Sequence, residues 1–275
     1  MASRDHYRSI ARANSEAFDL GLYEAVDGTI VDIAETLKTA ARRTQLVDRP
    51  PLLPDPLPQY TTRMTLSVED TLSGLECVTA EIASPVCGLN FASARSPGGG
   101  YLRGGSAQEE SLCRATTLYP AIAAQEGFYK ANKAWPNAIY SDAMLYSPDV
   151  LVIRDRHELL RPDPFPVGIV TAAAPNKKAL IEAGMEAKLG QEVDLALSRR
   201  VDCILRIALA QGHRAIVLGA WGCGVFGNDA DQVAGLFADA LSGPFRGCFE
   251  RVHFAVPGDE NDKTLIAFRR HFASR

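Results

Sequence analysis

The sequence is poor in the residues that build metal sites and disulfide frameworks. Its 275 residues include only six cysteines and five histidines. No two cysteines form a C-x-x-C pair, and the histidines show no spacing typical of metal ligands. We therefore predict reduced, mostly buried cysteines, no metal and no other cofactor. Cys223 is the exception among them, because it lies in a glycine-rich segment.

The chain also lacks a charge excess of one sign and a long apolar run. Its formal net charge is -4, so the basic footprint of a general nucleic-acid binder is missing and no direct DNA binding is expected. A single anionic group held by backbone amides is still compatible with this charge. No apolar run reaches membrane-spanning length, and the first residues have no apolar signal-peptide core. These features predict a cytoplasmic protein without a membrane partner.

Apolar residues recur with periods that predict both strands and helices. Val86–Phe91 and Ala215–Ala220 are apolar runs typical of strands buried on both faces. Glu192–Gly212 and Asp229–Leu241 carry apolar residues at helical spacing. The alternation predicts an α/β domain whose sheet is covered on both faces, with ligands beyond the carboxyl ends of its strands. Further helices are expected at Asp5–Gly21, Ala107–Tyr119, Asn176–Ala187 and Asn261–Phe272, and further strands at Arg63–Val68, Tyr140–Leu145, Val150–Arg154, Val167–Ala172 and Val252–Val256.

A cluster of prolines follows the first predicted helices. Its members are Pro50, Pro51, Pro54, Pro56 and Pro58. Such a composition is typical of a stiff linker. Residues 1–58 are therefore predicted to form an N-terminal helical extension with a proline-rich linker, packed on the main body, and residues 59–275 to form the main domain.

The most informative segment lies between Asn90 and Tyr119. It contains the triple glycine Gly98–Gly100 and then a predicted helix start with Glu109 and Glu110 in its first turn. Glycine lets the backbone approach a ligand closely, and a helix N-terminus offers unpaired N–H groups to an anion. The segment therefore predicts a loop that curls against a ligand, with two carboxylates at its edge.

The first turn of this helix also has a purely structural interpretation. Ser106 and Glu109 fit the capping box S-x-x-E, in which Glu109 would only cap the helix. Carboxylates in a first turn are favoured by the helix dipole as well. Pro120 is expected to end the helix.

A second glycine-rich segment, Gly219–Asp229, follows the predicted strand Ala215–Ala220. Its successive N–H groups could form an anion-binding nest, and Asn228 or Asp229 could cap the next helix. No Lys-Ser/Thr pair follows, so it is not a Walker loop. Phe226 could pack against a sugar or base, or belong to the core.

Together, the two segments resemble the bacterial-type poly(ADP-ribose) glycohydrolases, a branch of the macrodomain superfamily. The family signature is a triple glycine, a short spacer and Gln-Glu-Glu. Here Gly98–Gly100 is followed, after seven residues, by Gln108, Glu109 and Glu110. The Gly-Cys-Gly-Val-Phe of residues 222–226 is similar to the diphosphate loop of the family. The likeness extends over nearly the whole chain.

The resemblance implies a three-layer α/β/α macrodomain with a mixed central sheet. It also implies a glycosidase that binds the terminal ADP-ribose of poly(ADP-ribose) and hydrolyses the ribose–ribose O-glycosidic bond, with ADP-ribosylated proteins as further partners. By this resemblance Glu110 would be the catalytic acid, and Glu109 would hold hydroxyls of the neighbouring ribose. The implied substrate-binding residues are Asn90, Gly98, Gly99, Gly100, Gln108, Gly222, Cys223, Gly224, Val225 and Phe226.

Simple geometry limits how two adjacent glutamates can act. Neighbouring helical residues point about 100° apart, so Glu109 and Glu110 can hardly flank one glycosidic bond. We predict a single acid–base carboxyl, Glu110, with the substrate diphosphate stabilising an oxocarbenium-like transition state. A general acid must arrive protonated, and burial beside negative charge raises the pKa of such a carboxyl.

Other functions stay open at this point. A mono-ADP-ribosyl-protein hydrolase would have the same fold, and a non-catalytic ADP-ribose reader would need the loops but not the adjacent carboxylates. Glu109 and Glu110 therefore favour an enzyme over a reader. A nucleotide-binding structural protein is a third alternative. Cleavage from the chain end is expected, although the residues leave internal cleavage open.

Overall fold

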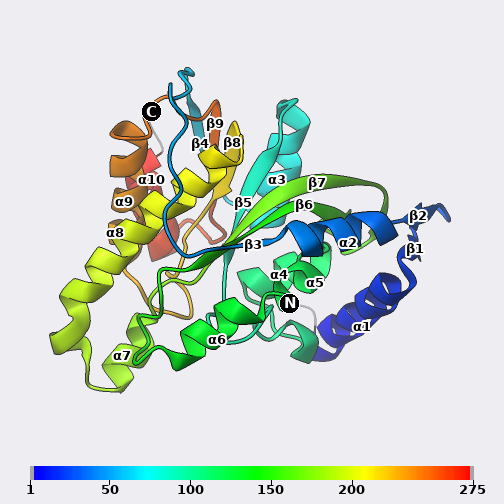
Figure 1. The fold of residues 1–275 in the computed structure, drawn as a ribbon, viewed down its shortest axis with the longest axis horizontal. Helices are drawn as coiled ribbons and strands as arrows, with labels where there is room; N and C mark the ends of the chain where they lie inside the picture. The colour runs from blue at the N-terminus through cyan, green and yellow to red at the C-terminus, as the bar shows by residue number, and fades with distance from the viewer. Residues whose placement is uncertain (1–2, 273–275) are drawn as a thin grey trace.

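A computed structural model describes residues 3–272, and their centre is a seven-stranded mixed sheet (Figure 1). The strand order is β3-β6-β7-β5-β8-β9-β4. The strands from β7 to β4 run parallel, whereas β6 and β3 are antiparallel to their neighbours. The strands are β3 Gln45–Val47, β4 Arg63–Ser67, β5 Val86–Phe91, β6 Met144–Arg154, β7 Leu160–Ala172, β8 Ala215–Leu218 and β9 Arg251–Ala255.

Helices cover both faces of the sheet, because its central strands are apolar on both sides. Ile216 and Leu218 of β8 pack into one core with α8, α9 and α10, while Val217 packs into another with α3, α4 and α5. Figure 1 shows these two groups of helices on opposite sides of the strands. The predicted three-layer α/β/α fold with a mixed sheet is confirmed. The helices are α3 Thr71–Glu81, α4 Gln108–Ala115, α5 Leu118–Ala123, α6 Glu126–Ala134, α7 Lys177–Glu182, α8 Glu186–Ala210, α9 Ala230–Ser242 and α10 Lys263–Phe272.

The N-terminal region contributes to the central sheet. It holds α1 Arg4–Leu20, the two-stranded sheet of β1 Leu22–Glu24 and β2 Ile30–Asp32, and α2 Ala34–Arg43. Strand β3 follows and pairs with β6, so residues before the proline cluster form one edge of the main sheet. The proline segment itself has no helix or strand. The division of the chain at residue 58 stays a prediction.

The predicted helix Ala107–Tyr119 is wrong, because the chain breaks between α4 and α5. Thr116 is extended and forms a β-bridge with Val152 of the sheet. The Thr116 hydroxyl accepts a hydrogen bond from the Leu118 backbone N–H at 3.1 Å, which starts the next helix. Pro120 does not end a helix. It lies in the first turn of α5, where its missing N–H is not needed.

Two other boundaries differ from the sequence prediction. The expected strands Tyr140–Leu145 and Val150–Arg154 are one strand, β6, which begins at Met144 and continues through an irregularity between Ser147 and Val150. The expected helix Asn176–Ala187 ends early, because Gly184 adopts a left-handed φ of 67° between α7 and α8. The remaining predicted elements are present, although α8 is longer than expected and β7 begins at Leu160 rather than Val167.

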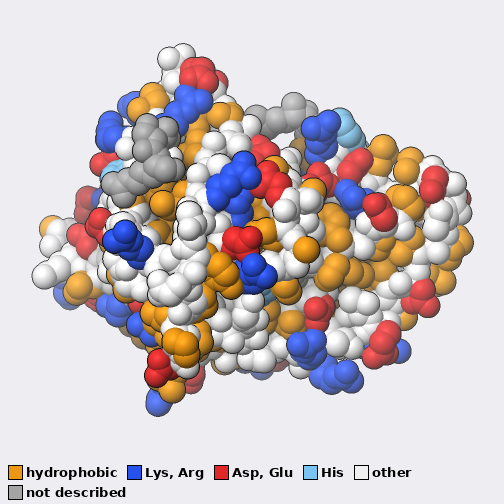
Figure 2. Space-filling view, turned by 90° about the horizontal axis from the view of Figure 1, so that it is seen from above, with side chains coloured by type: hydrophobic (Ala, Val, Ile, Leu, Met, Phe, Trp, Pro, Cys, Tyr) orange, Lys and Arg blue, Asp and Glu red, His pale blue; other side chains and the backbone are white. Residues whose placement is uncertain are grey.

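The surface shows no field of one charge sign on the face drawn in Figure 2. Basic and acidic side chains lie beside one another there, with apolar and uncharged atoms between them. Within residues 3–272, no helix combines the length and the apolar character needed to cross a membrane. In the same range, no three His, Cys, Asp or Glu side chains gather into a candidate metal site.

Candidate active site

Both glycine-rich loops begin at the same edge of the sheet. Strands β5 and β8 are parallel neighbours, with Val86 opposite Ala215 and Gly88 opposite Val217. Their carboxyl ends therefore open into one cleft of about 860 Å³. The cleft is lined by both loops, including Gly99, Glu110 and Phe226. Both loops thus lie beyond the carboxyl ends of neighbouring strands, where the α/β pattern predicts a ligand.

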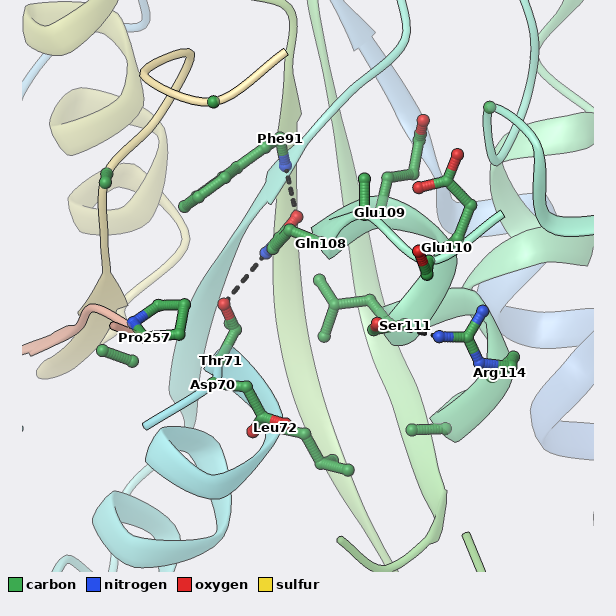
Figure 3. Close-up of a pocket in the computed structure, with 18 of the residues that line it drawn as sticks. Asp70, Thr71, Leu72, Phe91, Gln108, Glu109, Glu110, Ser111, Arg114 and Pro257 are labelled. Carbon is green, nitrogen blue, oxygen red and sulfur yellow. Dashed lines mark hydrogen bonds between the residues drawn. The ribbon is translucent and has the colours of Figure 1, made fainter. Parts of the chain in front are cut away.

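Gly99 is the point at which the two carboxyl groups of α4 converge. A Cβ atom on Gly99 would lie 2.7 Å from Glu110 Oε1 and 3.1 Å from Glu109 Oε2. The residue also has a left-handed φ of 56°. Both facts require glycine at this position. Figure 3 shows the two glutamate side chains extending from the first turn of α4 toward the same region.

Glu110 has one oxygen held by the loop and one oxygen without a protein donor. The Gly100 N–H donates to Glu110 Oε1 at 2.7 Å. No donor among residues 3–272 contacts Glu110 Oε2. The side chain is half-buried at the cleft wall. This geometry fixes the carboxyl while leaving one oxygen for a bound substrate.

Glu109 is the buried member of the pair, only 3% exposed. Its Oε1 accepts from Asn90 Nδ2 at 3.1 Å and its Oε2 from the Ser93 N–H at 2.8 Å. Burial raises the pKa of Glu109 to about 8, and the Glu110 charge adds to this, against the lowering effect of the two hydrogen bonds. At neutral pH Glu109 is therefore mostly protonated in the free protein.

The capping-box interpretation of Glu109 is wrong. The N-cap residue of α4 is Ala107, which makes no side-chain hydrogen bond to the helix. Ser106 lies outside the helix and is exposed. The Glu109 side chain turns inward to Asn90 and Ser93 instead, so tertiary contacts rather than capping explain its position.

Gln108 and Asn90 lie behind the two glutamates. Gln108 accepts from the Phe91 N–H at 2.8 Å and donates to Thr71 Oγ1 at 3.1 Å (Figure 3). It also donates to the Leu89 carbonyl at 2.8 Å. It thereby ties α4 to β5 and α3. Asn90 is fully buried and orients Glu109. The structure thus places both side chains as supports of the carboxyl pair.

The second loop is shaped by tight packing. A Cβ on Gly222 would lie 2.5 Å from Ala174 Cβ, and Gly222 has a left-handed φ of 75°. Asn228 Nδ2 donates to the Pro175 carbonyl at 2.8 Å and to the Gly222 carbonyl at 3.0 Å. Asp229, rather than Asn228, caps α9 by accepting from the Gln232 N–H.

The tip of this loop faces the cleft with free backbone donors. Within the described residues, the N–H groups of Gly224, Val225 and Phe226 donate to no protein acceptor. Val225 is 74% exposed, which is unusual for valine. Burial raises the pKa of the Cys223 thiol to about 12, so this cysteine stays protonated and is unsuited to act as a nucleophile.

Sequence reasoning missed two residues beside the loop tip. The Tyr140 ring centroid lies 6.3 Å from that of Phe226, and the Arg95 guanidinium lies 5.6 Å from the Tyr140 centroid. Phe226 is also partly packed against the core. Arg95 stands within the first glycine-rich segment, but Tyr140 has no local sequence signal that connects it with this site.

Comparison with known proteins identifies relatives of this chain. The family model of the microbial-type PARG catalytic domain matches residues 11–155. The poly(ADP-ribose) glycohydrolase of Thermomonospora curvata has a TM-score of 0.89 and 38% identity over 98% of this chain and 100% of that chain. The same protein bound to the inhibitor ADP-HPD gives 0.87 and 37% over the same shares. The Deinococcus radiodurans enzyme in complex with ADP-ribose gives 0.77 and 34%, over 86% and 97%.

The comparison with curated protein sequences gave no match. The structural matches nevertheless extend along both chains, and they confirm the macrodomain-like fold and the predicted resemblance. The family model alone covers more than half of the chain. The family model and the structural matches together show that the chain belongs to the microbial-type poly(ADP-ribose) glycohydrolases.

Proposed function

We propose that this glycohydrolase cleaves the ribose–ribose bond of poly(ADP-ribose) with Glu110 as the general acid and releases ADP-ribose from the chain end. The observation that carries the proposal is the convergence of Glu109 and Glu110 on Gly99 inside the shared cleft. Related enzymes were solved with ADP-ribose and with ADP-HPD, which supports the same ligand class here. ADP-ribosylated proteins are the expected partners, without direct DNA contact.

Glu110 suits the acid role better than Glu109. The leaving ribose oxygen must receive a proton from a group within hydrogen-bond reach. Glu110 Oε1 is anchored by Gly100, and its Oε2 has no partner in the described residues. Both oxygens of Glu109 already accept protein hydrogen bonds. A mostly neutral Glu109 would hold a ribose hydroxyl and would add no negative charge beside the substrate diphosphate.

The second loop would hold the diphosphate. The free N–H groups of Gly224, Val225 and Phe226 form the kind of backbone nest that binds phosphate oxygens. A diphosphate fixed there would place the adjoining ribose between the two loops. Its negative charge would also stabilise the oxocarbenium-like transition state. The loop would therefore act in catalysis as well as in binding.

The decisive test is Glu110→Gln, which keeps the shape of the side chain but removes its acid function. Turnover of poly(ADP-ribose) should fall by about 10² to 10⁴, while calorimetry should show an ADP-ribose affinity close to that of the wild type. Glu192→Gln, at an exposed position of α8, is the control and should retain turnover. Retained turnover in Glu110→Gln would refute the assignment.

Product analysis distinguishes the alternatives within the fold. Release of ADP-ribose from polymer, without longer fragments, is the outcome expected for cleavage from the chain end. Faster release from a singly modified protein than from polymer would instead indicate a mono-ADP-ribosyl-protein hydrolase. Binding of ADP-ribose without any release would indicate a reader.

A further inference from the structure

We propose that Arg114 is a positioning residue for Glu110, and that helix α1 belongs to the active site because it holds Arg114 in place. The inference rests on the proposed role of Glu110. Arg114 lies one turn after Glu110 on α4 and lines the same cleft. It is not expected to touch the reacting atoms.

Three hydrogen bonds, joined through the backbones of Gly105 and Gly100, connect the Arg114 guanidinium with the Glu110 carboxyl. Arg114 Nη1 donates to the Gly105 carbonyl at 2.5 Å. The Gly105 N–H donates to the Gly100 carbonyl at 2.9 Å, which closes the loop. The Gly100 N–H then donates to Glu110 Oε1 at 2.7 Å. Displacement of the Gly105 carbonyl would therefore move the Gly100 N–H, the donor to Glu110 found among residues 3–272.

Gly105 lies directly between Arg114 and Glu110. A Cβ on Gly105 would lie 2.9 Å from both Cγ and Oε1 of Glu110. The carbonyl of the same residue accepts from the Arg114 guanidinium. The loop is thus clamped against the catalytic side chain, with no space for a side chain at this glycine.

The hydrogen bonds of Arg114 require a guanidinium. The residue is only 5% exposed, and its second terminal nitrogen donates to Ser111 Oγ at 2.9 Å. Its Nε lies 3.7 Å from Glu158 Oε1, which supplies a counter-charge. A planar fork reaches these groups together, whereas a lysine ammonium is a single point. Burying the charge is costly, which argues that the loop contact has a function.

Helix α1 contacts both Arg114 and the loop. The Tyr7 ring centroid lies 3.9 Å from the guanidinium carbon of Arg114. Asn14 Nδ2, from the same helix, donates to the Arg114 carbonyl at 2.8 Å. A Cβ on Gly104 would lie 2.3 Å from the Arg4 carbonyl oxygen, so α1 packs directly on the loop backbone. The N-terminal helix therefore supports both Arg114 and the loop that contains Gly104 and Gly105.

The test measures kcat, KM, ADP-ribose Kd and thermal unfolding for Arg114→Met. We expect kcat to fall about 100-fold, the usual cost of misplacing a catalytic group by about 1 Å. The ADP-ribose Kd should stay within about threefold of the wild type, because Arg114 is proposed to affect the chemical step and not the binding of ADP-ribose. A structural role alone would lower the folded fraction without changing the kcat of the folded protein.

Two further variants keep the test decisive if Arg114→Met does not fold. Arg114→Lys should retain part of kcat, since one donor can still reach the Gly105 carbonyl. Tyr7→Leu should lower kcat less than Arg114→Met but with the same unchanged Kd. The matched control is Arg12→Met, at an exposed α1 position whose guanidinium pairs with Glu16, and it should leave kcat unchanged. Wild-type kcat in folded Arg114→Met, or in both Arg114→Lys and Tyr7→Leu, would overturn the inference.

The same experiment includes Glu110→Gln, so two failures can be told apart. If Glu110→Gln keeps its turnover, the proposed acid is wrong. If Glu110→Gln is inactive while Arg114→Met is fully active, the acid stands and only the positioning role of Arg114 is refuted.

Discussion

Replacing Glu109 by glutamine should stabilise the free protein, and increasingly so as the pH rises. Glu109 is buried, and its pKa is raised to about 8 by that burial, with Glu110 adding to the effect. Glutamine keeps the size of the side chain but has no charge to desolvate. Its amide needs an acceptor where Glu109 now accepts from Asn90. Asn90 Oδ1 has no partner in the described residues, so a turned Asn90 amide supplies that acceptor.

The sign and the size of the effect follow from proton linkage. Below about pH 4.5 the carboxyl is protonated in both the folded and the unfolded state, so its ionisation costs nothing. Between pH 4.5 and 8 only the unfolded state loses its proton, and the wild type loses stability. The pKa difference, from 4.5 to about 8, sets an upper limit of about 5 kcal/mol at pH 8 and about 3 kcal/mol at pH 7.

Urea unfolding at several pH values between about 5 and 8 measures this difference. Fluorescence of the fully buried Trp221 reports loss of the fold. The free energy of unfolding of Glu109→Gln minus that of the wild type should rise steadily across this range. The control Glu192→Gln, at an exposed position, should give a difference that stays flat.

A pH-independent difference between Glu109→Gln and the wild type would refute this reasoning. It would mean that Glu109 is ionised in the folded protein across the whole range. The raised pKa of Glu109 would then be wrong, and with it the argument that Glu109 brings no negative charge beside the substrate diphosphate.

Two other substitutions test the loops themselves. Gly99→Ala places a Cβ 2.7 Å from Glu110 Oε1 and should lower kcat at least tenfold. It should also destabilise the fold by about 1–2 kcal/mol, because an L-residue is strained at positive φ. Gly184 has a similar φ of 67°, but a Cβ built on it meets no described atom within 4 Å. Gly184→Ala should therefore lower the thermal stability and keep the wild-type kcat. Equal losses of kcat in Gly99→Ala and Gly184→Ala would contradict the argument that the contact with Glu110 matters. Asn228→Ala removes two hydrogen bonds that hold the Gly222 loop and should weaken ADP-ribose binding by about tenfold to a hundredfold in calorimetry. An unchanged Kd would argue against a role of this loop in holding the diphosphate.

Much of the fold was predictable because its strands and helices are locally encoded. Strand β5 matches the predicted Val86–Phe91, and α9 begins beside its expected cap, because apolar periodicity and capping depend on neighbouring residues. The break between α4 and α5 could not be predicted in this way. It depends on the bridge between Thr116 and Val152, two residues that only the sheet brings together.

The site shows the same division. The spacing from Gly98–Gly100 to Glu109 and Glu110, and the glycines of the second loop, were sufficient to indicate the family and the cleft. The support from α1 was not visible, because the contact between Tyr7 and Arg114 joins residues far apart in the chain. Neither residue has a motif of its own that indicates this role.

The sequence by itself determined that a glycine loop precedes a helix and that Glu109 and Glu110 share the first turn of this helix. It could do so because glycine freedom and helix periodicity are local properties. It did not distinguish the two adjacent carboxyls. Tertiary packing buried Glu109 against Asn90 and Ser93 and left Glu110 at the cleft wall. Burial changes the cost of a charge, and burial depends on neighbours that only the folded chain brings into contact.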